Sequence, residues 1–159
     1  MVAQRQDSLI EAIRSEVVAF YGTSLVSLAI FGSVARGSAR PESDIDLFIV
    51  CDNLPDGRRR RVAQFLEMED RLRAKHPAIV RVLLSPVIKT PAELGRGSPL
   101  LWDMTEETTI LFDREETLAR CLDGVRERLL KLGAHKVFRP EGWYWVLKAD
   151  YRPGEVFEI

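Results

Sequence analysis

Two short motifs near the start of the chain carry residue types that could bind a metal ion and phosphate. Gly32-Ser33 directly follows an apolar run, and after ten intervening residues Asp44 and Asp46 open a second apolar run. Because side chains alternate faces along a strand, the two aspartates are expected to point the same way. Carboxylates together with substrate phosphates are the ligands that commonly hold Mg²⁺. The Asp-x-Asp motif therefore predicts a magnesium site with Asp44 and Asp46 as its ligands.

The Gly-Ser motif predicts a different chemistry. Gly32 would let the backbone approach a ligand closely, and the Ser33 hydroxyl together with amides that start a helix can hold phosphate oxygens. Arg36 and Arg40 add positive charge nearby. Alone, a Gly-Ser pair is usually only a turn, and an Asp-x-Asp is often a solvated strand edge. Here both occur in order, and aspartates within an apolar strand cost stability unless they are used. The combination favours a phosphate-binding turn beside a metal site.

The order and spacing of these motifs resemble a known signature. Gly32-Ser33, ten residues and then Asp44-x-Asp46 is similar to the signature of the DNA-polymerase-beta-like nucleotidyltransferase superfamily. The short chain and the closeness of the two parts resemble its minimal nucleotidyltransferase (MNT) branch. The resemblance covers residues 25–50, roughly a sixth of the chain.

The resemblance implies a fold, an activity and partners. The fold would be α/β, a mixed sheet with flanking helices. The activity would be Mg²⁺-dependent transfer of a nucleotide, with AMP expected, from a nucleoside triphosphate, with ATP expected, to a protein or small-molecule hydroxyl. It assigns Asp44 and Asp46 to catalysis and metal binding, and Gly32, Ser33 and Arg36 to the nucleotide phosphates. Some MNT proteins are antitoxins that bind and adenylylate a HEPN-type toxin, so a HEPN-like protein is a candidate partner.

One part of the family pattern is missing from its expected place. The family has a third carboxylate on a strand beside the Asp-x-Asp strand, assigned to deprotonating the attacking hydroxyl and to a second metal. The expected strand here is Ala78–Leu84, which would put Arg81 or Val82 near that position and carries no acid. Three acids follow in a segment that favours a helix: Asp103, Glu106 and Glu107. Asp103 or Glu106 could supply the carboxylate only by folding back toward the pair.

Three functional hypotheses follow from this pattern. The intact Gly-Ser and Asp-x-Asp motifs favour an enzyme. The missing acid favours a binding module, such as an antitoxin-like protein that binds nucleotide or a partner without turnover. An aminoglycoside-type transferase is a third and weaker alternative, for which no acceptor pocket can be located in the sequence.

Composition limits the partners and the compartment. The chain has 159 residues, a length that predicts one domain over 1–159, and its net charge is −1. The resemblance implies that this is a nucleotidyltransferase domain, and the sequence adds an aromatic-rich extension from about residue 134. A near-neutral surface argues against a template-dependent polymerase, so no template nucleic acid is expected. Cys51 and Cys121 lack metal-ligand spacing and fit a reducing compartment. With no signal core and no membrane-length apolar run, we expect a cytoplasmic protein without a membrane.

Periodicity predicts alternating strands and helices, which favours an α/β core. The expected strands are residues 25–31, 45–50, 78–84 and 110–112. The expected helices run from residue 7 or 8 to about 20, over 58–75, from short starts after Thr90 and Ser98, and over 115–132.

Two further segments leave alternatives open. Four arginines at 58–61 form either a solvated helix end or a patch for phosphate or a partner, since they oppose the helix dipole there. The aromatic segment 142–148 is either a final strand or arm packed on the core, or a surface that stacks on a nucleobase or docks a partner. The apolar alternation over 155–159 predicts that the end of the chain is docked.

Overall fold

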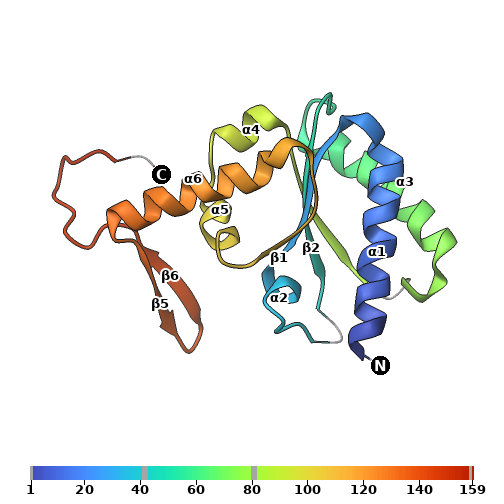
Figure 1. Cartoon of the computed structure of the whole chain (residues 1–159), viewed down its shortest axis with the longest axis horizontal. Helices are drawn as coiled ribbons and strands as arrows, with labels where there is room; N and C mark the ends of the chain where they lie inside the picture. Colours follow the sequence, from blue (N-terminus) through green and yellow to red (C-terminus); the bar gives the residue numbers. More distant parts are fainter. Residues whose placement is uncertain (1, 41–42, 80–81, 158) are drawn as a thin grey trace.

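The computed structural model describes residues 2–40, 43–79, 82–157 and 159, and in these it shows one four-stranded sheet with helices on both faces (Figure 1). Helices α1 (Val2–Tyr21) and α3 (Arg58–Lys75) cover one face. Helices α4 (Pro91–Gly95), α5 (Pro99–Met104) and α6 (Thr117–Leu132) lie on the other. The predicted α/β fold class, a mixed sheet with flanking helices, is confirmed.

The sheet has the order β3-β2-β1-β4. Its strands are β1 (Leu25–Phe31), β2 (Ile45–Cys51), β3 (Leu84–Lys89) and β4 (Thr108–Asp113). β1 runs antiparallel to β2 and β4, and β2 runs parallel to β3. The two central strands, β1 and β2, are covered on both faces, which explains why they read as nearly continuous apolar runs rather than as alternating ones.

A core lies on each side of the sheet. One contains buried side chains of α1 and α3: Ile13, Val17, Phe65, Met68 and Leu72. The other contains buried side chains of α4, α5 and α6: Leu94, Leu101, Met104, Leu118, Leu122, Val125 and Leu129. Asp46 is the one residue of β2 that is only half-buried, so it interrupts an otherwise buried strand.

Register brings the two motifs together. Phe31, the last residue of β1, pairs with Asp46 near the start of β2. The chain leaves β1 directly into the four-residue helix α2 (Gly32–Ala35). The Gly-Ser turn therefore lies beside the Asp-x-Asp motif, although ten residues separate them in sequence.

The prediction of a third strand over Ala78–Leu84 is wrong in position. A short 3₁₀ helix, η2 (Pro77–Ile79), occupies its start, and β3 begins only at Leu84. Residue 81, expected near the site, lies outside the described residues, and Val82 precedes the strand. The observed strand runs through Pro86, although proline commonly ends a strand. β3 is an edge strand, where proline is tolerated because no neighbouring strand needs its missing N–H.

Most helix predictions hold, with shifts at their starts. The Thr90 start is confirmed as a capping box with Glu93. Helix α1 begins earlier than predicted, at Val2. Helix α6 begins at Thr117 rather than at 115, because the backbone before it is left-handed and the Asp113 carboxylate accepts hydrogen bonds from the amides of Leu118 and Ala119.

The aromatic segment forms a second, two-stranded sheet of β5 (His135–Arg139) and β6 (Gly142–Val146). This hairpin projects away from the main sheet, beside α5 and the end of α6 (Figure 1). Beyond it, the docking predicted for the end of the chain holds for Ile159, which packs against the second core, and is wrong for Val156, which is 90% exposed.

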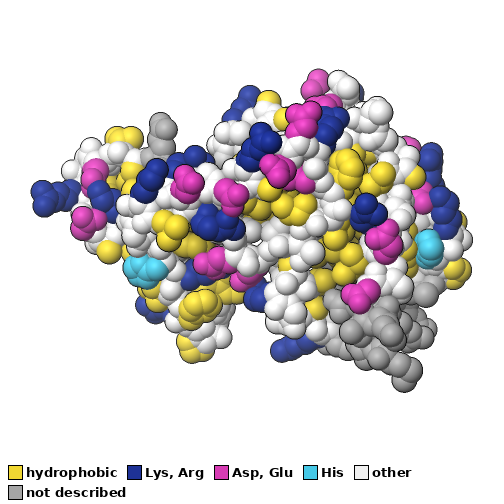
Figure 2. Space-filling model, viewed as in Figure 1, with side chains coloured by type: hydrophobic (Ala, Val, Ile, Leu, Met, Phe, Trp, Pro, Cys, Tyr) yellow, Lys and Arg dark blue, Asp and Glu magenta, His cyan; other side chains and the backbone are white. Residues whose placement is uncertain are grey.

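Acidic and basic side chains alternate over the face of the molecule seen in Figure 2, including the surfaces of α4 and α6. This mixture agrees with the near-zero net charge. Within the described part of the chain, no helix is both long enough and apolar enough to span a membrane.

Candidate active site

The end of β1 and the start of β2 border a cavity of about 330 Å³. Its lining comes from the two motifs, from α5 with the residues that follow it, and from the hairpin: Phe31, Gly32, Ser33, Arg36, Asp46, Leu100, Asp103, Met104, Glu107 and Trp143. The structure thus places four of the five residues predicted from the sequence around one cavity. The fifth, Asp44, lies just before β2 and is exposed.

The backbone of Gly32 lies directly against the Asp46 carboxylate in this cavity. Its φ of 70° is in the left-handed region, and a Cβ built on it would lie 2.6 Å from Asp46 Oδ2. At that distance the Asp46 carboxylate would have to shift to admit a side chain at position 32, so glycine is what lets the turn lie directly against the carboxylate as it stands. The pairing of Phe31 with Asp46 sets this contact.

The electrostatics of the aspartate pair suit a cation. Burial, and secondarily the negative charge of Asp44, raise the pKa of Asp46, while a hydrogen bond with Ser85 lowers it. A divalent ion bound beside Asp46 would offset the cost of its buried charge. The donor set therefore fits the Mg²⁺ predicted from the sequence.

In the described part of the chain, a third carboxylate does not join this pair. Among the residues that the structure describes, no group of three or more His, Cys, Asp or Glu side chains could hold a metal ion. The residue opposite Asp46 on β3 is Ser85, whose hydroxyl cannot act as a carboxylate base.

Asp103 reaches the cavity wall, but its carboxylate has other partners. Its Oδ1 accepts hydrogen bonds of 3.0 Å from Nε1 of both Trp143 and Trp145, and Lys136 Nζ lies 3.1 Å away. Burial alone would raise the pKa of Asp103, but the hydrogen bonds from Trp145, Trp143 and Lys136 outweigh it, and the pKa is lowered. A carboxylate held in its charged form is a weak general base, so Asp103 serves to anchor the hairpin.

Of the other charged residues considered from the sequence, Glu107 lines the cavity, whereas Glu106 and Arg40 do not. Glu106 is exposed, forms an ion pair with Lys136 at 2.9 Å, and is not part of the cavity lining. Arg40 is also exposed and outside the lining; its backbone N–H is bonded to Ser43 Oγ. Glu107 does line the cavity, where it is ion-paired with Arg36.

Arg36 is held in place by three contacts. Its Nε donates to Ser38 Oγ at 3.1 Å, its Nη1 pairs with Glu107, and its guanidinium carbon lies 5.1 Å from the centre of the Trp143 ring. The positive charge predicted beside the Gly-Ser turn is thus present, and it contacts the carboxylate of Glu107 and the indole of Trp143.

Trp143 also lines the cavity, although the sequence left the role of the aromatic segment open. The aromatic segment was known, but neither its packing against α5 nor its contact with Arg36 could be read from the chain. The available signal was the alternation of Trp143 and Trp145, which places both indoles on one face of a strand.

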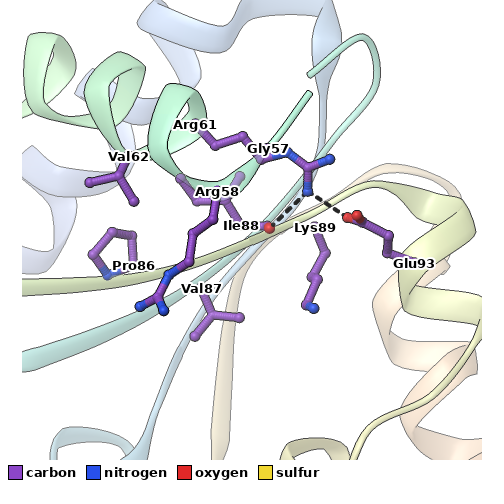
Figure 3. Close-up of a pocket in the computed structure, with 9 residues that line it drawn as sticks. All are labelled: Gly57, Arg58, Arg61, Val62, Pro86, Val87, Ile88, Lys89 and Glu93. Atoms are coloured by element: carbon purple, nitrogen blue, oxygen red, sulfur yellow. Dashed lines mark hydrogen bonds and ion pairs between the residues drawn. The ribbon is translucent and has the colours of Figure 1, made fainter. Parts of the chain in front are cut away.

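A second cavity, of about 410 Å³, lies at the opposite end of β3 (Figure 3). Arg58 and Lys89 point into it, and Arg61 forms an ion pair with Glu93 at 2.6 Å. None of the residues predicted to bind nucleotide or metal lines it. The arginine run therefore lies outside the lining of the candidate active site, and its fourth member, Arg61, has a structural partner.

Three comparisons relate the chain to known proteins. Residues 10–115 match the family model described as "Nucleotidyltransferase domain". The chain is 30% identical over 110 residues to "Putative protein adenylyltransferase MJ1305" of Methanocaldococcus jannaschii, covering 67% of this chain and 71% of that protein.

Two solved structures are similar at lower identity. One, titled as a nucleotidyltransferase from Sulfolobus solfataricus, has a TM-score of 0.46 at 20% identity and covers 72% of this chain and 88% of its own. The other, titled as a toxin-antitoxin with AMP-PNP, has a TM-score of 0.44 at 15% identity, covering 76% and 92% respectively. The family match ends before α6 and the hairpin.

Proposed function

The chain belongs to the nucleotidyltransferase domain family, and from that premise we propose that it transfers a nucleotide from a nucleoside triphosphate to a hydroxyl group. The observation that carries the proposal is the cavity in which Gly32 and Ser33 face Asp46. The similar protein named as an adenylyltransferase supports AMP as the transferred group, ATP as its donor and a protein hydroxyl as the acceptor.

Each residue has a role in this proposal. Asp44 and Asp46 would hold Mg²⁺, which when bound supplies charge stabilisation to the phosphates. Gly32 leaves room for the triphosphate against the carboxylate. Ser33 donates its hydroxyl, and Arg36 places its guanidinium, toward phosphate oxygens.

The transfer step balances simply. The acceptor oxygen forms a bond to the α-phosphorus, the bond from that phosphorus to the bridging oxygen breaks, and pyrophosphate leaves. The acceptor proton must go to a base or to water. Because no third carboxylate joins the Asp44–Asp46 pair in the described residues, we expect slow transfer; loss of a positioned base costs about 10²- to 10⁴-fold in rate.

The same observation favours a second function. With Ser85 opposite Asp46, the cavity could bind Mg²⁺ and nucleotide without turnover. The protein would then be a binding module, such as an antitoxin-like partner of a HEPN-like protein. Transfer and binding must therefore be measured separately.

The test compares wild-type protein with the Asp44→Asn/Asp46→Asn variant. The control is Asp56→Asn/Asp70→Asn, which removes the same charge from two exposed positions outside the cavity. Calorimetry with ATP and Mg²⁺ reports binding, and labelled ATP, GTP, CTP and UTP report transfer to candidate acceptors.

We expect nucleotide binding in wild type and control, and its loss in the double cavity variant. Equal binding in all three proteins would refute the assignment of the cavity. Binding without transfer to any acceptor tried would favour the binding module over the enzyme.

A further inference from the structure

Trp143 lies in the candidate active site although it comes from a part of the chain beyond the family match. It is one of the residues lining the cavity with Gly32, Ser33 and Asp46, and it is 40% exposed. Its ring lies over the Arg36 guanidinium at 5.1 Å. The hairpin therefore contributes a wall to a site otherwise built by the sheet, α2, α5 and the residues after α5.

Trp143 is itself fixed to α5. Its Nε1 donates to Asp103 Oδ1 at 3.0 Å, and Lys136 Nζ lies 5.1 Å from the centre of its ring. The Lys136 side chain is only 4% exposed and contacts the carboxylates of Asp103, Glu106 and Glu107. An indole with these anchors offers Arg36 a defined surface rather than a mobile one.

Arg36 has two kinds of partner in this site, and they differ in what they would do to a phosphate ligand. Glu107 neutralises the guanidinium charge, so a bound phosphate would compete with it for the same donors. The Trp143 ring contacts the guanidinium while leaving its full charge and its N–H groups available. When a phosphate displaces Glu107, the Trp143 ring and the Ser38 hydroxyl remain to orient Arg36, and of these two only the ring belongs to the cavity lining.

We propose that Trp143 is a positioning residue for nucleotide binding: it holds Arg36 toward the triphosphate, and through it the β5–β6 hairpin becomes part of the active site. This inference rests on the proposed function, because it takes Arg36 to contact phosphate. It deepens that proposal by assigning a role to a segment beyond residue 115, the end of the family match.

The experiment compares Trp143→Ala, Trp143→Phe and a matched control, Tyr144→Ala. Tyr144 is the next residue of β6, is 45% exposed, stacks on Arg139 and does not line the cavity. Binding of three probes is measured by calorimetry with Mg²⁺: ATP, inorganic tripolyphosphate and adenosine. Circular dichroism and thermal unfolding establish that each variant is folded.

We expect Trp143→Ala to weaken ATP and tripolyphosphate binding by about three- to tenfold and to leave adenosine binding unchanged, because the effect passes through the phosphates. Trp143→Phe keeps a ring for Arg36 and should recover much of the affinity. Tyr144→Ala should match wild type. In an Arg36→Ala background, Trp143→Ala should cause no further loss, because the residue through which it acts is gone.

The outcomes separate the inference from the proposed function. If wild-type protein binds neither ATP nor tripolyphosphate, the proposed function fails and the inference fails with it. If wild type binds ATP and Trp143→Ala binds it equally well, the inference alone is overturned. A loss that persists without Arg36 would show that the indole does not act through Arg36, and a loss that also affects adenosine would show that it contacts the nucleoside; either result would overturn the positioning role. Should Trp143→Ala fail to fold, Trp143→Leu, which removes the aromatic ring but keeps an apolar side chain, is compared in the wild-type and Arg36→Ala backgrounds instead.

Discussion

Gly32 has only a hydrogen atom where every other residue has a Cβ, and this allows the turn to lie against Asp46. A Cβ on Gly32 would lie 2.6 Å from Asp46 Oδ2, and the φ of 70° would strain any other residue. We expect Gly32→Ala to weaken Mg²⁺-ATP binding more than about tenfold, because the carboxylate must shift. The matched control is Gly37→Ala: its φ is 72°, but nothing lies within 4 Å of its added Cβ. Equal effects of the two variants on calorimetric binding would show that backbone strain, rather than the Asp46 contact, is responsible.

The charge of Asp46 should itself cost stability when no cation is bound. Burial, and after it the charge of Asp44, raise its pKa above the ordinary 3.8. The folded state thus holds this proton more tightly than the unfolded state, and stability is lost as pH rises through 3.8 and the folded pKa. At pH 7 without metal we expect Asp46→Asn to be more stable than wild type, with the difference fading as pH falls toward 3.8.

Urea unfolding in EDTA and in Mg²⁺ measures this difference. Mg²⁺ should stabilise wild type and not the variant, because binding to the folded state adds to its stability. Asp70→Asn, an exposed acid outside the cavity, is the control. A variant less stable than wild type in EDTA at pH 7 would contradict the origin assigned to the pKa shift.

At the scale of elements, helix α4 shows how a local signal fixes a boundary. Glu93 accepts from the Thr90 amide, pairs with Arg61 at 2.6 Å, and thereby joins α4 to the start of α3. The hydrogen bond from Arg61, and then that from Thr90, lower the pKa of Glu93 from 4.5 to about 2. The contribution of the charged Glu93 to folding stability is therefore complete above pH 4.5 and is lost as pH falls toward 2.

We expect Glu93→Gln to cost about 1 kcal/mol at pH 7 and progressively less below pH 4.5, measured by urea unfolding at several pH values. A cost that is the same at pH 3 and pH 7 would contradict the role of the charge.

The elements that the sequence predicted well are those with local signals. Strand β1, helix α3 and the start of α4 match because an apolar run, an amphipathic period and a capping box each lie within a few neighbouring residues. Strand β3 was misplaced because the tolerance of Pro86 depends on a position at the sheet edge, which is a property of the whole sheet.

In the candidate site, too, residues in local motifs could be predicted, whereas contacts between distant segments could not. Gly32, Ser33 and Asp46 could be chosen as candidates because their chemistry lies in two short motifs, and all three line one cavity. The hydrogen bond from Trp143 to Asp103 spans 40 residues and follows from how the hairpin packs on α5, which no local pattern encodes.

At the scale of the whole molecule, one lysine joins the hairpin to the rest. Lys136 on β5 contacts Asp103, Glu106 and Glu107 at 2.9–3.5 Å, and the Trp143 and Trp145 rings lie 5.1 and 5.3 Å from its ammonium. Burial alone would lower its pKa, but the hydrogen bonds with Glu106 and Asp103 outweigh this and raise it, so the lysine stays charged. Removing that charge would leave three neighbouring carboxylates without their shared cation.

We expect Lys136→Met to destabilise the protein by about 1–3 kcal/mol, because the acids are partly exposed and water recovers some of the loss. The matched control is Lys148→Met, which removes an ion pair with Glu155 on the exposed tail and should destabilise the protein less than Lys136→Met does. Chemical unfolding gives both values, and tryptophan fluorescence of the folded variants reports whether Trp143 and Trp145 become solvated. If the hairpin forms one wall of the site through Trp143, Lys136→Met should also weaken tripolyphosphate binding while the rest of the protein stays folded. Unchanged fluorescence and unchanged binding in a folded Lys136→Met protein would show that the hairpin is held by its indoles and apolar contacts alone, without the ion cluster.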